Sequence, residues 1–445
     1  MNNYFLKVNK LMFNTQKTLI VLLLLTATLV VNSQEKMKLS ISKALELGMG
    51  SSNFLNASNS KVRAAKAKVN EVSTYGLPSL KFSGSYNRLS EVDEFKVNGF
   101  SIFPVLLNQT NLQLNLVQPI FTGNKISASK EASENMAKAA ENDFTKDKSE
   151  TNFAIKNAYW NLKKAMKYRD LSDENVAQMQ IHLQEIKNLS KNGMATDNDV
   201  LKIEVMLNDA MLRQLDAQNN VQIASVYLNN GLGLDLTTEL DLETEPNTAS
   251  SDKGQLLPLI DKAIKARPEV VANEFRIKAA ENSIDVTKSA YYPQVSVGGN
   301  FTYANPNQRW IPNRDEFKST WAVGVNVSYE IWNWNVTGYQ VEQSEAQVLQ
   351  AKDGLNQIKD GILMETTQNY LSYNQNKKKI TISEIGAKQA EENLRVTMQK
   401  FKAGMALSSD VTDAEVALLQ AKTNHIQALI DFEIASAKLD KSIGE

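Results

Sequence analysis

The sequence has no cysteine and only two histidines, His182 and His425, which lie far apart along the chain. The absence of cysteine excludes disulfides, thiol nucleophiles, cysteine-ligated metals and a lipid anchor on an N-terminal cysteine. Two distant histidines argue against a histidine-rich metal site or a catalytic triad, and no other cluster of nucleophile, base and ligand types stands out. The sequence therefore predicts no enzyme, no metal and no cofactor.

An excess of charge of one sign is also lacking. Lys and Arg number 49 against 50 Asp and Glu, which leaves a net charge of −1 at pH 7. This balance argues against a nucleic-acid-binding protein and against a polybasic membrane-surface protein, because both need an excess of positive charge. With 445 residues, 42% of them hydrophobic, the chain is long enough to bury a core.

Long apolar runs are absent except for one near the N-terminus. The uncharged stretch Thr18–Val31 follows three lysines and precedes a small residue, Ser33, at a plausible cleavage site. A membrane-spanning helix needs about 20 apolar residues, more than this stretch offers. We therefore expect residues 1–33 to be a signal peptide rather than a transmembrane anchor, and the mature protein to be either soluble outside the cytoplasm or inserted in a membrane as a β-barrel.

The chain contains an internal repeat. Residues 191–205 (KNGMATDNDVLKIEV) and 402–416 (KAGMALSSDVTDAEV) share Lys, Gly, Met, Ala, Asp, Val, Glu and Val at a constant offset of 211 residues. Repeats of this kind indicate two copies of one structural unit. We predict the copies at 38–234 and 256–445, joined by an acidic, turn-forming linker at 235–255.

Four segments alternate apolar side chains with small or polar ones, as strands do. They are residues 79–87, 110–118, 294–303 and 320–330. Such strands could cover a soluble core or face lipid in a membrane barrel. Aromatic residues at one end of the strands favour the membrane, because aromatic girdles form at membrane interfaces. These residues are Tyr75, Phe121, Tyr291, Tyr292, Trp332 and Trp334.

Four strands are too few to close a barrel, which takes about eight. A barrel built from this chain therefore requires several copies, and a trimer would supply about twelve strands.

Two long segments, 124–191 and 335–402, contain no proline and are predicted to be helices. A continuous helix of this length would extend about 100 Å. Val341, Val348, Leu355 and Ile362 recur every seven residues, which indicates coiled-coil packing. The apolar stripe is narrow, so these helices suit either a solvated rod or a ring around a water-filled lumen.

The exported N-terminus, the duplication, two strands and one long helix per copy, and the triplet Arg267-Pro268-Glu269 opening the second copy together resemble the TolC-type outer-membrane efflux protein (outer membrane factor) family. The resemblance implies an α+β membrane protein that forms a homotrimer. Four strands per protomer would build a 12-stranded β-barrel in the outer membrane, continuous with a long α-helical barrel in the periplasm.

The same resemblance implies a passive channel of a tripartite efflux or type I secretion system. An inner-membrane pump of the RND or ABC type would supply the energy, and a periplasmic adaptor (membrane fusion) protein would dock at the helical tips. A different class of protein, a periplasmic coiled-coil scaffold or an adaptor without its own pore, is the alternative.

Gly193 and Gly404 lie where each long helix must reverse direction, and glycine adopts the left-handed backbone at such helix ends most easily. The resemblance makes the residues that follow them candidates for adaptor docking. These are Met194, Ala195, Met405 and Ala406.

Asp410 and Asp413 are three residues apart and share one helix face. In a trimer they would form two rings of carboxylates, and the resemblance places them at the pore constriction, with Asp199 as a further member from the first copy. The alternative is a role at helix starts, with Ser408 or Ser409 as cap before Asp410 and Thr196 as cap before Asp199. Ala406 stands where the family usually has an arginine, which argues against an arginine lock.

Overall fold

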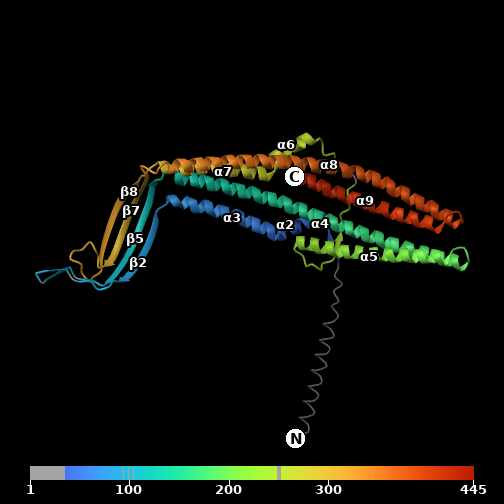
Figure 1. Ribbon diagram of the computed structural model, residues 1–445, viewed down its shortest axis with the longest axis horizontal. Coiled ribbons are helices and arrows are strands. Elements are labelled where there is room, and N and C mark those ends of the chain that lie inside the picture. Colours follow the sequence, from blue (N-terminus) through green and yellow to red (C-terminus); the bar gives the residue numbers. More distant parts are fainter. Residues whose placement is uncertain (1–35, 94, 99, 104, 248–251) are drawn as a thin grey trace, which may run out of the picture. The chain divides into compact units, whose positions relative to one another are not determined.

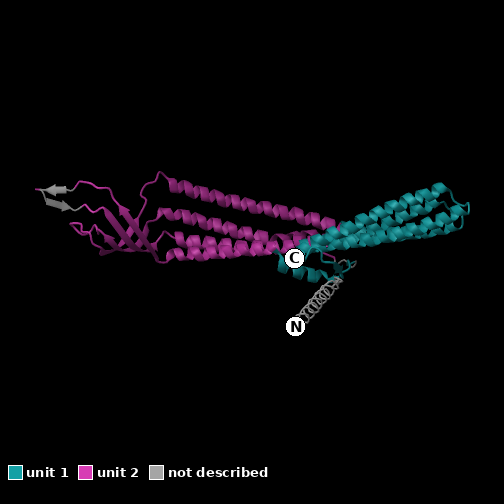
Figure 2. Cartoon of the chain, turned by 90° about the horizontal axis from the view of Figure 1, so that it is seen from below, with its two compact units in different colours: residues 1–52, 154–250, 375–434 teal, residues 53–153, 251–374, 435–445 magenta. Residues whose placement is uncertain are grey.

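The computed structural model describes residues 36–93, 95–98, 100–103, 105–247 and 252–445. The predicted signal peptide lies outside the described residues, as do residues 248–251 of the predicted linker. The chain forms two compact units (Figure 2). Unit 1 takes its described residues from 1–52, 154–250 and 375–434, and unit 2 from 53–153, 251–374 and 435–445. Each unit therefore combines segments from both copies of the repeat.

Unit 2 contains a four-stranded antiparallel sheet (Figure 1). Its strands are β2 (Ser79–Arg88), β5 (Asn108–Phe121), β7 (Gln294–Asn305) and β8 (Lys318–Ser328), in the order β2-β5-β7-β8. A short hairpin of β3 (Phe95–Val97) and β4 (Phe100–Phe103) lies between β2 and β5 in the sequence. The central pairing of β5 with β7 joins the two copies of the repeat into one sheet.

The register of the sheet separates an apolar face from a polar face. One row across the four strands consists of Phe82, Leu114, Phe301 and Trp321. The adjacent row, whose side chains point to the opposite face, consists of Lys81, Asn115, Asn300 and Ala322. The period-two pattern of the sequence thus becomes two chemically different surfaces.

The helical part of unit 2 has a core on the first half of α8 (Val336–Lys402). Here α6 (Leu256–Ala266) and α7 (Pro268–Lys288) contribute Ala263, Val270 and Ile277 to a buried cluster with Leu355 and Ile362. The other helical segments of unit 2 are α3 (Asn53–Ser73), the beginning of α4 (Lys125–Lys191) and the last turns of α9 (Ser408–Ser442). Two short 3₁₀ turns, Thr74–Gly76 and Ser289–Tyr291, precede β2 and β7.

The seven-residue spacing in α8 marks its buried side. Val348, Leu355 and Ile362 are each at most 8% exposed, and Tyr373 and Ile380 continue the buried series in a shifted phase. Such spacing keeps one face of a long helix against its neighbours, as in coiled coils.

Unit 1 has its main core near a two-stranded parallel sheet of β1 (Met37–Leu39) and β6 (Leu240–Leu242). The surrounding helices are α2 (Ile41–Ser51), the second halves of α4 and α8, α5 (Asp197–Leu232) and most of α9 (Ser408–Ser442). The buried Tyr159 hydroxyl donates to the Leu39 carbonyl at 3.0 Å and accepts from the Thr244 N–H at 3.1 Å.

Strand β6 falls within the predicted linker 235–255. Leu240 and Leu242 are each 4% exposed, whereas Asp241 between them faces solvent. This part of the segment therefore belongs to the core of unit 1.

Within the described part of the chain, no helix combines the length and the hydrophobicity that crossing a membrane requires.

Candidate functional site

The two long helices of unit 1 end in the same backbone motif. Gly193 and Gly404 have φ of +72° and +74°. After α4, the Gly193 N–H donates to Ser190 O and the Met194 N–H to Leu189 O, both at 2.9 Å. After α8, Gly404 and Met405 make the corresponding bonds to Phe401 and Lys400. These paired bonds form a Schellman motif, which requires the left-handed conformation that glycine adopts at little cost.

The helix that follows the first turn begins with a capping box. The Thr196 hydroxyl accepts a hydrogen bond from the Asp199 N–H at 3.2 Å, and the Asp199 carboxylate accepts one from the Thr196 N–H at 3.0 Å. The Thr196 hydroxyl also donates to that carboxylate at 2.7 Å. These bonds, led by that of the hydroxyl, lower the pKa of Asp199. The capping alternative for Asp199 is therefore present in the structure.

The second turn has only half of this box. Asp410 accepts a hydrogen bond from the Leu407 N–H at 2.9 Å, as Asp199 does from Thr196. Leu407 has no hydroxyl to return the bond, and its side chain is 69% exposed. Asp413, one turn further on, is exposed.

A groove of about 730 Å³ lies between the two turns of unit 1. It brings together Met194, Ala195, Asp199, Ala406 and Asp413 from the residues that the sequence singles out. The other predicted tip and constriction residues, Gly193, Gly404, Met405 and Asp410, are not among its lining residues.

Sequence reasoning missed Lys202, which also lines this groove. Lys202 occupies the position in the first copy that Asp413 occupies in the second, at the offset of 211. A position-by-position comparison of the two copies would have identified this reversal of charge.

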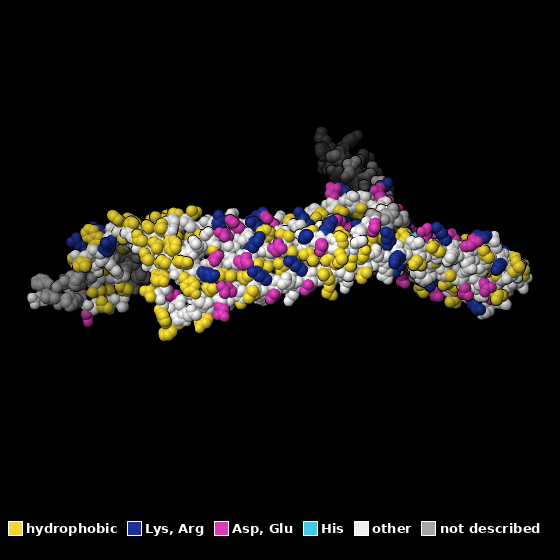
Figure 3. Space-filling view, turned by 90° about the horizontal axis from the view of Figure 1, so that it is seen from above, with side chains coloured by type: hydrophobic (Ala, Val, Ile, Leu, Met, Phe, Trp, Pro, Cys, Tyr) yellow, Lys and Arg dark blue, Asp and Glu magenta, His cyan; other side chains and the backbone are white. Residues whose placement is uncertain are grey.

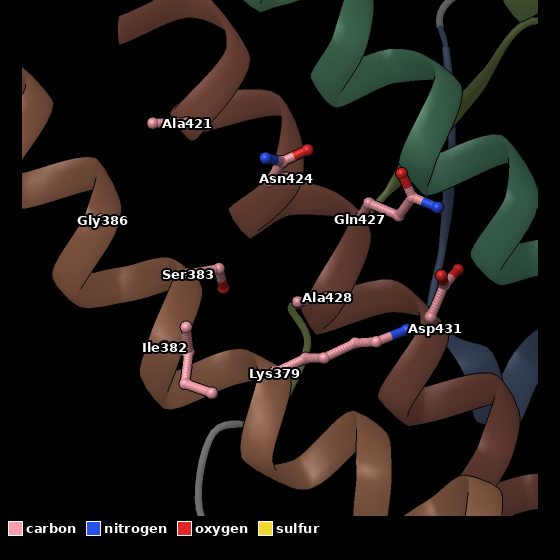
Figure 4. Close-up of a pocket in the computed structure, with 9 residues that line it drawn as sticks. All are labelled: Lys379, Ile382, Ser383, Gly386, Ala421, Asn424, Gln427, Ala428 and Asp431. Carbon is pink, nitrogen blue, oxygen red and sulfur yellow. The ribbon is translucent and has the colours of Figure 1, made fainter. Parts of the chain in front are cut away.

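A second groove, of about 490 Å³, lies between α8 and α9 (Figure 4). Small residues such as Gly386, Ala421 and Ala428 make room for it, and Lys379 and Asp431 lie at one end. Lys164 of α4 pairs with Asp431 at 3.2 Å. None of the predicted tip or constriction residues lines this groove.

The predicted interface aromatics all lie in unit 2, where the strands of the sheet meet the helices. Tyr75 and Tyr291 belong to the 3₁₀ turns, Phe121 ends β5, and Trp332 and Trp334 lie between β8 and α8. All are exposed, and Trp334 reaches 81%. The Trp332 and Trp334 rings contact each other edge to face, with centroids 5.6 Å apart.

The exposed hydrophobic surface continues over the sheet. Leu80, Phe82, Trp321, Val323 and Val325 are each at least 64% exposed. Figure 3 shows hydrophobic side chains gathered over the strands and their junction with the helices, whereas charged residues of both signs cover the helices. A contiguous apolar surface of this kind marks contact with a partner or with lipid.

The described residues contain no group of three or more His, Cys, Asp or Glu side chains arranged to hold a metal ion.

Comparison with known proteins identifies the family. The family model described as outer membrane efflux protein matches residues 49–234 and 259–445, once for each copy of the repeat. The chain belongs to the outer membrane efflux protein family.

Individual members of the family are distant in sequence. The chain is 21% identical to the outer membrane protein TolC of Vibrio cholerae over 323 residues, which cover 71% of this chain and 72% of that protein. It is 20% identical to the outer membrane efflux protein BepC of Brucella suis, over 97% of this chain and 91% of that protein.

Solved structures show the same fold. The outer membrane protein VceC of Vibrio cholerae superposes with a TM-score of 0.75 at 17% identity, covering 91% of this chain and 96% of that chain. The fold class expected from the sequence is thereby confirmed: long helices, four antiparallel strands per chain and a tandem repeat. This outer membrane efflux protein is a channel of the outer membrane that takes part in export, and its family is non-enzymatic.

Proposed function

We propose that three copies of this outer membrane efflux protein join their sheets into one 12-stranded barrel and form a passive conduit from the periplasm to the exterior. The observation that carries this proposal is the sheet of unit 2. Strands β2 and β8 are its outer strands, and neither has a partner on its outer edge among the described residues. Unpaired edges cannot stay exposed in lipid, because each unsatisfied backbone group costs several kcal/mol there.

The chemistry of the sheet supports the same arrangement. Four strands from each of three copies exceed the minimum of about eight for a closed barrel. The apolar row that contains Phe82 and Trp321 suits lipid, and the row that contains Lys81 and Asn115 suits a water-filled lumen. The aromatics at the helical end of the strands suit the membrane interface. Membership in a family of trimeric channels also implies a homotrimer.

The proposal extends to the two copies of the repeat. Residues 38–234 and 256–445 would each supply two strands and one helical hairpin, with 1–33 removed on export and 235–255 as the connection. The helices would extend into the periplasm, and Asp199, Asp410 and Asp413 would line the constriction at their tips. Rings of carboxylates concentrate cations and repel anions.

The turns of unit 1 would receive a periplasmic adaptor, through which an inner-membrane pump supplies the energy. Met194 and Met405 are 67% and 73% exposed at the two turns. Exposed methionines form adaptable apolar surfaces that suit docking.

Two measurements on the purified protein test the proposal. Light scattering in detergent, corrected for bound detergent, should give about three times the mass of the mature chain, since closure needs about twelve strands. Planar lipid bilayers should show discrete conductance steps. A monomer that forms no conducting pore would refute the proposal, and recovery from the soluble periplasmic fraction after mild lysis would favour the scaffold alternative.

A further inference from the structure

The α4–α9 contact in unit 1 contains a buried carboxyl group that lacks a full set of partners. Glu415 is 4% exposed, and its Oε2 atom has no hydrogen-bond partner among the described residues. Its neighbours Val411, Ala414 and Leu418 on α9 are also buried, so Glu415 lies in the middle of the face that α9 packs against the rest of the unit. A buried carboxylate without partners is costly, whereas a protonated carboxyl group is much less so.

Among the residues that the structure describes, no Lys or Arg forms an ion pair with Glu415. From α4, Glu185 adds a second negative charge that acts on it. His182, also on α4, is 1% exposed. Its Nε2 lies 3.3 Å from the Ser408 hydroxyl oxygen, and its Nδ1 has no hydrogen-bond partner within the described part of the chain. Burial lowers the pKa of His182, although the charge of Glu185 opposes this, and the environment therefore favours the neutral imidazole. From α8, Lys402 reaches Glu185 at 3.8 Å and is itself well exposed.

The first copy of the repeat contains an ion pair that has no counterpart at the corresponding positions of the second copy. Glu204 is the counterpart of Glu415 at the offset of 211, and it pairs with Lys187 at 2.7 Å. Its side chain is 41% exposed. The counterpart of Lys187 in the second copy is Met398, which carries no charge. The difference in burial and partner makes Glu415 the unusual member of the two.

We propose that Glu415 is a proton-binding site that controls the contact between α9 and α4: protonated, it packs beside Glu185, and deprotonated, it drives the first turns of α9 away from α4. Those turns also carry Asp410 and Asp413. The consequence for the channel entrance therefore rests on the proposed function, whereas the contact itself does not.

The direction of the pH effect follows from linkage. Burial, and secondarily the charge of Glu185, raise the pKa of Glu415 from 4.5 to about 7. When α9 moves away, the carboxyl group is in water and regains its ordinary pKa. The contact is therefore strongest below the ordinary pKa, weakens as the pH rises above it, and is weakest once the pH has passed about 7.

Amide hydrogen exchange of the full-length protein in detergent tests this inference. The exchange rates of peptides within 408–421 should be measured at pH 6 and pH 9, and each rate should be divided by the intrinsic exchange rate at that pH before the two are compared. A carboxyl group whose pKa is about 7 when packed and ordinary when free predicts an increase in opening of roughly tenfold between these pH values.

Three variants identify the group responsible. Glu415→Gln, a neutral isostere, should abolish the pH dependence, and Glu204→Gln, the matched control, should keep the full tenfold change. Glu185→Gln, which leaves Glu415 in place, should reduce the change because it removes the neighbouring charge. A flat wild-type profile, or the same pH dependence in Glu415→Gln as in wild type, would overturn the inference.

Conductance in planar bilayers tests the consequence for the entrance. The wild-type channel should conduct more at pH 9 than at pH 6, and Glu415→Gln should show no such difference. If amide exchange depends on pH but conductance does not, the proposed role of Glu415 at the channel entrance is overturned. Failure to conduct at any pH would count against the proposed function, and the exchange result would still decide the contact.

Discussion

At the scale of single residues, Asp199 and Asp410 occupy equivalent positions in the two copies of the repeat and make the same backbone hydrogen bond. Each carboxylate accepts the backbone N–H of the residue three positions earlier, at the start of a helix. A carboxylate there also interacts favourably with the positive end of the helix dipole. The copies differ at the capping residue. The Thr196 hydroxyl accepts a hydrogen bond from the Asp199 N–H, whereas Leu407 has no hydroxyl to accept one.

This difference predicts that Leu407→Thr stabilises the start of α9. The new hydroxyl would complete the capping box with Asp410, and the exposed Leu407 side chain gives up little packing. A good cap contributes about 1 kcal/mol. Amide exchange in the first two turns of α9 should slow by several-fold, and the reciprocal Thr196→Leu should speed exchange at the start of α5. Unchanged exchange in both variants would show that the caps contribute nothing at these helix starts.

The sequence reveals some of these residues and hides others. Gly193 and Gly404 are recognisable because a reversing helix needs a left-handed residue, and both have positive φ. Glu415 is not recognisable from its own sequence context, since it looks like an ordinary charged residue on a helix. Its burial becomes apparent only when α4 packs against it, although the change from Lys187 to Met398 between the copies is a signal that could have been used.

At the scale of elements, the sheet depends on both copies of the repeat. Two strands alone are marginally stable, and the pairing of β5 with β7 supplies the four-stranded sheet. Alternation along each strand predicts which residues share a face. It does not predict the order β2-β5-β7-β8, because the partner of a strand is set by tertiary contacts rather than by its own pattern.

The two faces of β8 predict opposite responses to a charge. Val323 lies on the apolar face opposite Gly299, and Ala322 lies on the polar face opposite Asn300. If the apolar face contacts lipid, Val323→Lys should destabilise insertion by about 2–4 kcal/mol near the bilayer centre, whereas Ala322→Lys should be tolerated. Protease protection after folding into lipid vesicles measures the inserted fraction. Equal insertion of the two variants would contradict the assignment of the faces.

Short elements escape prediction for a related reason. Strand β6 lies in an acidic segment that reads as a linker, yet its two leucines are buried against the core of unit 1. Three residues are too few to establish a period, so only the parallel pairing with β1 identifies them as a strand.

At the scale of the whole molecule, the repeat and the long helices are evident in the sequence, but the compact units are not. The copies follow one another along the chain, whereas each unit draws on both of them. The reason is the length of α4 and α8, which are single helices of 67 residues and contribute to the cores of both units. The sequence therefore predicts which helices and strands are present, whereas tertiary packing determines which of them contact one another.

The proposed conduit makes a prediction that depends on the complete trimer. If Asp410 and Asp413 form rings at the periplasmic entrance, a trivalent cation added on the side of the helical hairpins should block conductance, because clustered carboxylates bind cations strongly. Asp410→Asn with Asp413→Asn should weaken the block by at least about tenfold, since a loss of about 1.4 kcal/mol in binding already corresponds to tenfold. The matched control, Asp209→Asn, removes an exposed acid of α5 that does not line the groove and should leave the block unchanged. If the double variant is blocked as strongly as wild type, the two aspartates do not line the constriction, and Asp410 keeps only its hydrogen bond from the Leu407 N–H at the start of α9.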